Sequence, residues 1–464
     1  MMLLSEAASA MQASLIGKDS SFNSVGTDSR NITKGQLFVA LKGDHFDGHD
    51  YAKLAIKQGA AAVLVSHQVA GAEPAIVVND TCLALGQLAA YWRNQFDLPV
   101  AAITGSNGKT TVKEMLASIL RAASNHSDAV LATVGNLNNH IGLPLTLLKL
   151  NKQHRYAVVE MGMNHTGEIS YLSKIGQPTV AVINNAGSAH IGELGSLEAI
   201  AKAKGEIFEG LAANGTAVIN ADNAFSALWI ALAGNHNVVT FGLENKADVS
   251  ATYQLQASAS MLEIHTPQGT VNVQLPAPGK HNVLNALAAT ATALSMGVSL
   301  NIIAAGLDCF AGAKGRLQPL NGCNGALVID DTYNANPMSM KVAIDVLVAK
   351  TGKKLLVLGD MGELGDNATE LHAEIGLYAK AAGVDALLTL GELSQHMVSA
   401  FGVGAQHYLT VEELSADLIA KMTPDATVLV KGSRFMAMER VVKQLVVKAI
   451  DKEATNATQN GEAH

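Results

Sequence analysis

Aromatic residues, charged residues and cysteine are all scarce in this chain, and each shortage excludes a class of protein. Aromatics make up only 4% of the 464 residues, too few for a surface that stacks nucleic-acid bases. The formal net charge is −8, whereas nucleic acids and anionic membranes require a basic surface. A hydrophobic fraction of 48% excludes a disordered chain, and the length predicts about three domains.

The three cysteines, Cys82, Cys309 and Cys323, are odd in number and far apart in the chain. They form neither a disulfide framework nor a Cys-x-x-Cys metal clip, which favours a reducing compartment. Residues 1–10 lack a basic segment and Glu6 interrupts their apolar run, so we expect no signal peptide and a cytoplasmic location.

Only one stretch is long and uncharged enough to be tested as a membrane span. No Asp, Glu, Lys or Arg lies between Lys280 and Asp308, but the segment is rich in Ala and Thr and is broken at Gly297. This pattern predicts two buried helices and no span.

Hydrophobic periodicity predicts an α/β protein with three domains and a polar, disordered tail at 451–464. Residues 1–97 hold short β-rich runs and a helix at 82–95, which predicts a small α/β domain that ends at the Asp-Leu-Pro turn of 97–99. Its predicted strands are 36–41, 61–65 and 76–78.

Residues 98–313 alternate buried strands with helices, as expected of a parallel sheet built from βαβ units. The predicted strands are 100–104, 156–160, 179–184 and 217–220. The pattern changes to strict alternation over 249–275, which predicts an antiparallel insertion with a hairpin turn at 267–269.

The small-residue segment 311–315 is a candidate hinge, and residues 314–450 after it predict a second doubly wound, Rossmann-like sheet. The predicted strands of this third domain are 326–329, 354–358, 386–390 and 427–430.

The strongest local motif is Thr-Gly-Ser-Asn-Gly-Lys-Thr-Thr at residues 104–111, between a buried strand and a helical pattern. Glycines let the backbone wrap around phosphates, Lys109 would reach the β- and γ-phosphates, and the Thr110 hydroxyl would bind Mg²⁺. Ile103 replaces the first Gly of the standard motif, so the loop is a shorter Gly-x-x-Gly-Lys-Thr variant. The expected ATP-binding residues of this loop are Gly105, Ser106, Asn107, Gly108, Lys109, Thr110 and Thr111.

Two side chains that follow neighbouring predicted strands are candidate metal ligands. Glu160 ends the strand 156–160, where ligand sites of parallel sheets lie, and a carboxylate suits Mg²⁺. His190 also follows a strand, although a lone His is more often a hydrogen-bonded structural residue.

Other polar residues have ordinary interpretations from composition alone. Lys204 lies in a helical pattern that indicates a solvated lysine, and 330–337 could be only a turn with Asx-type hydrogen bonds. Lys431, Ser433 and Arg434 follow a strand, where they indicate either an anion site or a surface salt bridge.

Together these residues resemble the ATP-dependent Mur ligase family from about Thr27 to Arg440. The short Thr-Gly-x-x-Gly-Lys-Thr loop is that family's form. The further motifs that carry the resemblance are Thr-Asp-Ser-Arg at 27–30, Asp-Gly-His at 47–49, Gly-Asn-Leu-Asn-Asn-His-Ile-Gly at 135–142, Met-Gly-Met-Asn-His at 161–165, Asp-Thr-Tyr-Asn-Ala-Asn-Pro at 331–337 and Gly-Asp-Met-Gly-Glu-Leu-Gly at 359–365.

The resemblance implies an enzyme that phosphorylates a substrate carboxylate with ATP and then lets an amine attack the acyl phosphate. Lys109 is similar to the phosphate-clamping lysine, and Thr110 with Glu160 to the ligands of a first Mg²⁺. His190 is similar to the ligand of a second Mg²⁺, and Lys204 to a lysine that family members carbamylate. Further contacts to ATP are implied for Asn282, Asn285, Arg316 and Asp331.

The motifs resemble the branch that joins D-alanyl-D-alanine to UDP-MurNAc-tripeptide, the last cytoplasmic peptide step of peptidoglycan precursor synthesis. We therefore expect these two substrates and a monomer that binds no nucleic acid. The substrate-binding residues so implied are Ser29, Arg30, Asn138, Asn139, Asn334, Lys431, Ser433 and Arg434.

Four alternatives stay open. A ligase that adds the third residue should carry an Asp-Asn-Pro-Arg motif in the last domain, where Asn-Ala-Asn-Pro stands instead; a folylpolyglutamate synthetase is the other relative within the family. A nucleotide-dependent switch would hydrolyse ATP without an amine acceptor, and a structural protein would have lost activity.

Overall fold

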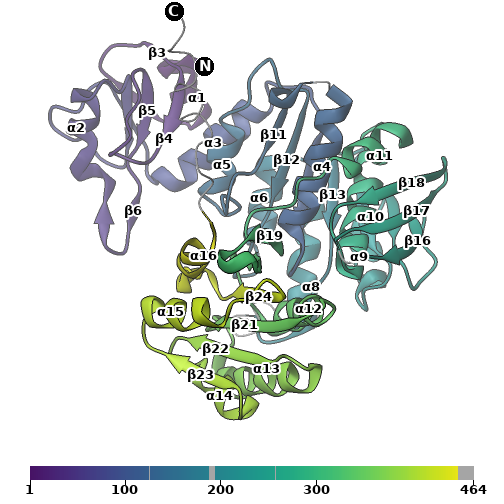
Figure 1. Cartoon of the computed structure of the whole chain (residues 1–464). Helices are drawn as coiled ribbons and strands as arrows, with labels where there is room; N and C mark the ends of the chain where they lie inside the picture. The colour runs from purple at the N-terminus through teal and green to yellow at the C-terminus, as the bar shows by residue number, and fades with distance from the viewer. Residues whose placement is uncertain (125, 188–193, 257, 448–464) are drawn as a thin grey trace, which may run out of the picture. The chain divides into compact units, whose positions relative to one another are not determined.

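The computed structural model describes residues 1–464 except 125, 188–193, 257 and 448–464. The chain divides into two compact units, residues 1–312 and 313–464, and the division falls inside the predicted hinge segment 311–315 (Figure 1). The predicted tail 451–464 lies outside the described residues.

The first unit opens with a five-stranded sheet in the order β2-β9-β8-β5-β4, here called the N-terminal sheet. All neighbours pair in parallel except β2 with β9, so the predicted small α/β region is present. The strands of this region are β1 (Met2–Leu3), β2 (Ser14–Ile16), β3 (Ser21–Phe22), β4 (Ser24–Gly26), β5 (Gln36–Val39), β6 (Lys42–Gly43), β7 (Phe46–Asp47), β8 (Ala62–Val65) and β9 (Ala75–Val77). Its helices are α1 (Leu4–Ala10), η1 (Gly48–Tyr51), α2 (Ala52–Lys57) and α3 (Thr81–Arg93).

The same unit holds a six-stranded, wholly parallel sheet in the order β11-β12-β10-β13-β14-β15, here called the central sheet. Its strands are β10 (Val100–Thr104), β11 (Val130–Ala132), β12 (Tyr156–Glu160), β13 (Val180–Ile183), β14 (Thr216–Asn220) and β15 (Asn237–Phe241). The helices around it include α4 (Lys109–Ser124), η2 (Ser127–Ala129), α5 (Gly142–Leu147), α6 (Glu168–Gly176), α8 (Leu197–Gly205), η3 (Glu206–Gly210) and α9 (Ser226–Ala233).

Both faces of the central sheet are buried, which explains its continuous apolar runs. Along β10, Val100 and Ala102 pack into one hydrophobic core, whereas Ala101 and Ile103 pack into the core formed with α4 and α10. The helices that follow the insertion are α10 (Lys280–Ser295) and α11 (Leu300–Asp308), so the uncharged stretch forms two helices as predicted. None of the helices among the described residues is long and apolar enough to cross a membrane.

The predicted antiparallel insertion is a three-stranded sheet, and Thr266 pairs with Gly269 across its tight turn. Its strands are β16 (Ser250–Leu255), β17 (Ser260–Thr266) and β18 (Gly269–Leu275). The apolar side chains of Leu262, Ile264 and Val273 face the core beneath the sheet, and polar side chains alternate with them.

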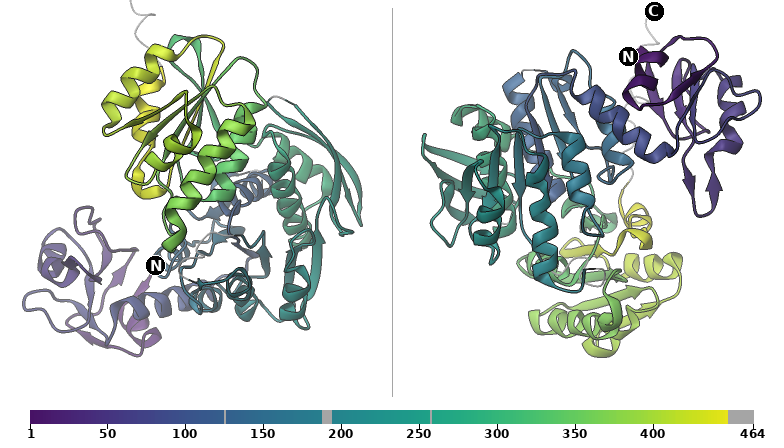
Figure 2. Two further views of the ribbon diagram at one scale, coloured as in Figure 1. Left: turned by 90° about the horizontal axis from the view of Figure 1, so that it is seen from below. Right: turned by 180° about the vertical axis from the view of Figure 1, so that it is seen from behind.

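The second unit is a six-stranded sheet in the order β19-β20-β24-β21-β22-β23, parallel except for β19. Helices cover both of its faces (Figure 2), and Val328 and Ile329 of β20 point into opposite cores. Its strands are β19 (Gln318–Asn321), β20 (Leu327–Asp331), β21 (Lys353–Gly359), β22 (Ala386–Leu390), β23 (Ala405–Tyr408) and β24 (Ala426–Lys431). Its helices are η4 (Cys323–Gly325), α12 (Pro337–Val348), η5 (Gly365–Asn367), α13 (Ala368–Ala382), α14 (Gln395–Phe401), α15 (Val411–Lys421), η6 (Arg434–Met436) and α16 (Glu439–Leu445). The predicted α/β class and doubly wound sheets are confirmed.

Candidate active site

The glycine-rich loop joins the buried strand β10 to helix α4, which begins at Lys109, as the sequence predicts. Gly108 has a φ of +81°, and a Cβ there would lie 2.4 Å from Asn184 Nδ2 and 2.5 Å from Asn285 Oδ1. Only glycine fits this position without displacing both amides. The loop therefore has the strand–loop–helix form that presents backbone N–H groups to phosphates.

A second loop, directly after β13, holds the glycine-rich loop in place. The Asn107 N–H donates to Asn185 Oδ1 (2.9 Å), and the side-chain amides of Asn184 and Asn185 both donate to the Asn107 carbonyl oxygen (3.0 Å each). The Ser106 hydroxyl donates to the Gly187 carbonyl oxygen (3.1 Å). The sequence analysis missed this support, although two consecutive asparagines at a strand end were a visible signal.

Thr110 and Glu160 meet at the start of α4. The Thr110 hydroxyl donates to Glu160 Oε2 (3.3 Å), and the Lys109 ammonium group donates to the Gly105 carbonyl oxygen (2.5 Å). Glu160 reaches this position because β12 lies beside β10 in register, with Glu160 opposite Ile103. The structure thus brings the predicted lysine, hydroxyl and carboxylate together at the carboxyl ends of adjacent strands.

The residues present fit a magnesium ion that also binds nucleotide phosphates. The Glu160 side chain is fully buried, and its Oε1 atom has no hydrogen-bond partner among the described residues. A carboxylate beside a hydroxyl and a phosphate loop is the hard-oxygen donor set that Mg²⁺ takes. His190, the predicted ligand of a second ion, lies outside the described residues.

Lys113 is a buried cation beside this carboxylate that the sequence analysis missed. Its ammonium group donates to the Thr133 carbonyl oxygen (2.7 Å) and lies 3.7 Å from Glu160 Oε1. Thr133 in turn accepts the Glu160 backbone N–H at its hydroxyl (3.0 Å). The signal was the three-residue spacing from Thr110, which places both side chains on one face of α4.

The prediction that Lys204 is a solvated lysine is wrong. The side chain, near the end of α8, is only 2% exposed. Burial and the nearby Lys109 cation lower the pKa of Lys204 well below its ordinary value. The pattern of 201–208 could not reveal this, because a helical pattern alone does not show how deeply one of its side chains is buried.

Asn282 and Asn285, two of the predicted contacts to ATP, are buried in the first turns of α10. Asn285 Oδ1 accepts from the Asn184 amide (3.0 Å), and the Asn282 amide donates to the Pro278 carbonyl oxygen (2.8 Å). Asn285 is therefore linked through Asn184 to the glycine-rich loop.

Asn138 and Asn139 lie beside the strand end that carries Glu160. The Asn138 carbonyl oxygen accepts from the Gly162 N–H (2.8 Å), and Asn139 Oδ1 accepts from the N–H groups of Ile141 and Gly142 at the start of α5. The Asn139 carboxamide oxygen is thus engaged in capping a helix.

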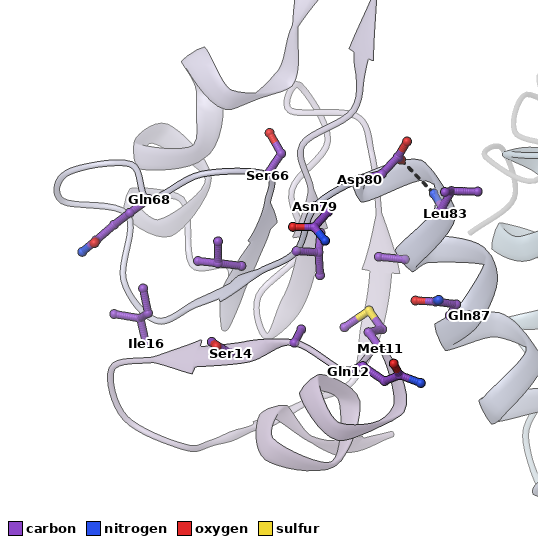
Figure 3. Close-up of a pocket in the computed structure, with 14 residues that line it drawn as sticks. Met11, Gln12, Ser14, Ile16, Ser66, Gln68, Asn79, Asp80, Leu83 and Gln87 are labelled. Carbon is purple, nitrogen blue, oxygen red and sulfur yellow. Dashed lines mark hydrogen bonds between the residues drawn. The ribbon is translucent and has the colours of Figure 1, made fainter.

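The N-terminal sheet carries Ser29 and Arg30 after β4, and a separate cavity of about 670 Å³ at the ends of β8 and β9 (Figure 3). Arg30 is exposed and pairs with Asp28 Oδ1 (2.9 Å), which lowers the pKa of Asp28. Neither Ser29 nor Arg30 lines the cavity. Among the described residues, Asp80 is the one charged residue that lines it, and its carboxylate accepts from two N–H groups at the start of α3.

In the second unit, Asp331 and Lys431 form a buried ion pair at the ends of β20 and β24. Lys431 Nζ lies 2.7 Å from Asp331 Oδ2 and also donates to the Asn334 carbonyl oxygen (2.8 Å). Asp331 Oδ1 accepts from the Leu317 N–H (3.1 Å), and the Arg316 guanidinium stacks on the Tyr333 ring at 3.9 Å. Four predicted residues are therefore close together: Arg316, Asp331, Asn334 and Lys431.

Ser433 and Arg434 differ in their surroundings. The buried Ser433 hydroxyl donates to the Ala335 carbonyl oxygen (3.2 Å) and accepts from the Gly362 N–H (2.8 Å). Arg434 is more than half exposed and pairs with Glu439 Oε1 (3.0 Å), so the surface salt bridge weighed from the sequence is present.

Three models of Mur ligase domains match successive segments of this chain. The Mur ligase family catalytic domain matches residues 21–93, the Mur ligase middle domain residues 103–293, and the Mur ligase glutamate ligase domain residues 315–434. The chain belongs to the Mur ligase family. Within that family it is 44% identical to the UDP-N-acetylmuramoyl-tripeptide–D-alanyl-D-alanine ligase of Escherichia coli K12, over 95% of this chain and 98% of the relative.

Solved Mur ligases have the same fold. MurF from Acinetobacter baumannii aligns with a TM-score of 0.87 at 40% identity, over 95% of this chain and 97% of that one. MurF from Thermotoga maritima, solved in complex with ADP, aligns with a TM-score of 0.81 at 29% identity, over 91% and 96%.

Proposed function

We propose that this Mur ligase joins D-alanyl-D-alanine to UDP-MurNAc-tripeptide and yields UDP-MurNAc-pentapeptide, ADP and phosphate. The observation that carries the proposal is the placement of Lys109, Thr110 and Glu160 at adjacent strand ends, in a chain 44% identical to a ligase of that name.

The reaction we propose has two steps. A carboxylate oxygen of the tripeptide forms a bond to the γ-phosphorus of ATP, and the bond to ADP breaks. The amine of D-alanyl-D-alanine then attacks the acyl carbon, loses a proton and expels inorganic phosphate, which leaves an amide. Both steps concentrate negative charge, so their transition states need fixed positive groups and exclusion of water.

The first unit supplies the phosphate-binding part. Lys109 binds the β- and γ-phosphates from the start of α4, and the loop N–H groups enclose them. Thr110 and Glu160 would hold a magnesium ion, which neutralises developing phosphate charge when bound. A second magnesium ion at His190 stays part of the proposal, and Asn282 and Asn285 would contact the adenine.

Lys204 would act as a carbamate. Its neutral amine can add CO₂ and release a proton, and the lowered pKa of Lys204 favours the neutral amine that this addition needs. The product is an anion, so it would attract the Lys109 cation, which the neutral amine does not, and it could bind cations.

Contacts to ATP from Arg316 and Asp331, in the second unit, stay part of the proposal. For the carboxylate of the dipeptide, Arg434 is the better placed candidate, because its guanidinium is exposed whereas the Lys431 ammonium already binds Asp331 and Asn334. Asn334 and Ser433 would line the same subsite.

For the sugar nucleotide, Ser29 and Arg30 would contact the diphosphate side, together with Asn138 and Asn139 nearer the peptide. The cavity at β8 and β9 offers uncharged amide and hydroxyl groups from Gln12, Ser66 and Asn79. Such a lining suits an uncharged part of the nucleotide sugar.

We also propose that the domains are residues 1–97, 98–313 and 314–450, and that the enzyme is a cytoplasmic monomer. Family membership weakens the proposal of a switch or an inactive structural protein. The 44% identity to a dipeptide-adding ligase favours that ligase over the one that adds the third residue and over a folylpolyglutamate synthetase.

Phosphate release from ATP tests the function. It should require both UDP-MurNAc-tripeptide and D-alanyl-D-alanine in the presence of Mg²⁺, with a UDP-MurNAc-pentapeptide found by mass spectrometry. Release that is indifferent to both substrates would favour an ATPase switch, and release with free amino acids or folate substrates would favour the other relatives.

A further inference from the structure

His372 of helix α13 is fully buried in the second unit, and the backbone uses both of its ring nitrogens. Its Nε2 accepts the Met361 N–H (2.9 Å), and its Nδ1 donates to the Ala368 carbonyl oxygen (2.6 Å). These two contacts assign the neutral tautomer with the proton on Nδ1. Burial lowers the pKa of His372, which keeps this tautomer neutral.

Met361 belongs to the loop 360–364 that follows β21, and the loop is held from several sides. The Asp360 carboxylate accepts from the N–H groups of Leu393 (3.1 Å) and Ser394 (2.7 Å). The Ser433 N–H donates to the Asp360 carbonyl oxygen (3.0 Å), and the Gly362 N–H donates to the Ser433 hydroxyl (2.8 Å).

This loop also holds an unusual backbone conformation. Glu363 has a φ of +61°, which costs energy for a residue with a side chain and persists only where the surroundings enforce it. Through Ser433, the loop connects to the segment after β24 and to the Ala335 carbonyl oxygen after β20. Three strand-end loops of the sheet therefore form one hydrogen-bonded unit around Ser433.

We propose that His372 is a positioning residue for the dipeptide subsite: it fixes the Met361 N–H and so the 360–364 loop that orients Ser433 and its neighbours. The inference rests on the proposed function, which places D-alanyl-D-alanine at Ser433 and Arg434. His372 itself touches no substrate, and its effect passes through the loop backbone.

A pair of matched variants separates the two hydrogen bonds. The amide of His372→Asn can reach only the position of Nδ1, so it keeps the bond to Ala368 and loses the bond to Met361. The amide of His372→Gln reaches the position of Nε2 and keeps the bond to Met361. His407→Leu, which removes the 2.9 Å contact of that histidine with Thr389 elsewhere in the sheet, is the control.

We expect His372→Asn to raise the KM for D-alanyl-D-alanine about tenfold, the effect of one lost hydrogen bond, while the KM values for ATP and UDP-MurNAc-tripeptide change less than about twofold. His372→Gln and His407→Leu should stay near wild type for all three substrates. Equal changes in all three KM values, equal effects of Asn and Gln, or loss of folding in either variant would make His372 an ordinary core residue and overturn the inference. Wild-type enzyme that releases phosphate without the dipeptide would instead overturn the proposed function, and the inference with it.

Discussion

Each of the two units contains one buried lysine that the sequence analysis named as a candidate site residue, and the two lysines differ in what surrounds them. Lys204 in the first unit and Lys431 in the second are both 2% exposed. Lys431 has the Asp331 carboxylate at 2.7 Å, and Asp331 opposes the effect of burial on its pKa. No ion pair of Lys204 is recorded within the described part of the chain, and the Lys109 cation adds to the effect of burial.

This difference in surroundings suggests different roles for Lys431 and Lys204. A buried charge is costly unless it is paired. Within the second unit, Lys431 and Asp331 each supply the opposite charge that the other needs. In the first unit, burial and the Lys109 cation lower the pKa of Lys204, which favours the neutral amine, the reactive form of a lysine. The pattern favours a chemical role for Lys204 and an architectural role for Lys431.

Removal of the Lys109 cation, which lies near Lys204, should have the largest effect on the rate of ligation. We expect Lys109→Ala to lower ligation to about one-thousandth or less, because the phosphates lose a fixed positive group, while the fold is kept. Lys202→Ala, which removes an exposed lysine of α8 that pairs with Glu198, is the control and should leave the rate unchanged. Unchanged turnover in Lys109→Ala would refute the phosphate-loop assignment.

Replacement of Lys204 should cost activity that a small molecule can restore. We expect Lys204→Ala to reduce ligation about a hundredfold, and formate or acetate to restore part of it by occupying the place of the carbamate. Initial rates measured across a series of added carboxylates check this. An absence of rescue at any concentration would count against a carbamate at this position.

Replacement of Lys431 should lower the free energy of unfolding more than replacement of Lys204 does. Lys431→Met should destabilise the second unit by about 3–5 kcal/mol, because it leaves the Asp331 carboxylate buried without its partner. Lys204→Met should be neutral or stabilising, because it replaces a lysine that has no recorded anionic partner among the described residues with an apolar side chain. Chemical denaturation of both variants measures the difference, and a larger loss in Lys204→Met would contradict the comparison.

The smallest expected effect is a dependence of stability on pH. The pKa of His372 is lowered in the folded protein, mainly by burial, so below about pH 6.5 the unfolded chain binds a proton that the folded chain does not. The free energy of unfolding should therefore fall as the pH drops below about 6.5. The decline should be less steep in His372→Gln, and an identical pH dependence in that variant would show that His372 does not contribute.

Local patterns predicted the glycine-rich loop, its carboxylate and four strands of each six-stranded sheet, because buried parallel strands and phosphate loops depend on contiguous residues. They missed β11 and β15 of the central sheet and β19 and β23 of the second unit. The boundaries of 100–104 and 156–160 match β10 and β12. Composition predicted a solvated Lys204, whereas the side chain is buried in the folded protein. It also missed Asn184, Lys113 and His372, because each binds a residue of another segment of the chain.

The most direct test of the ligase reaction follows one oxygen atom. UDP-MurNAc-tripeptide labelled with ¹⁸O in its reacting carboxylate should give one ¹⁸O atom in the released phosphate for each UDP-MurNAc-pentapeptide formed, because the oxygen that joins carbon to phosphorus leaves with the phosphate. Mass spectrometry of both products measures this ratio. Unlabelled phosphate would mean that water attacks ATP directly, and it would contradict the acyl-phosphate account.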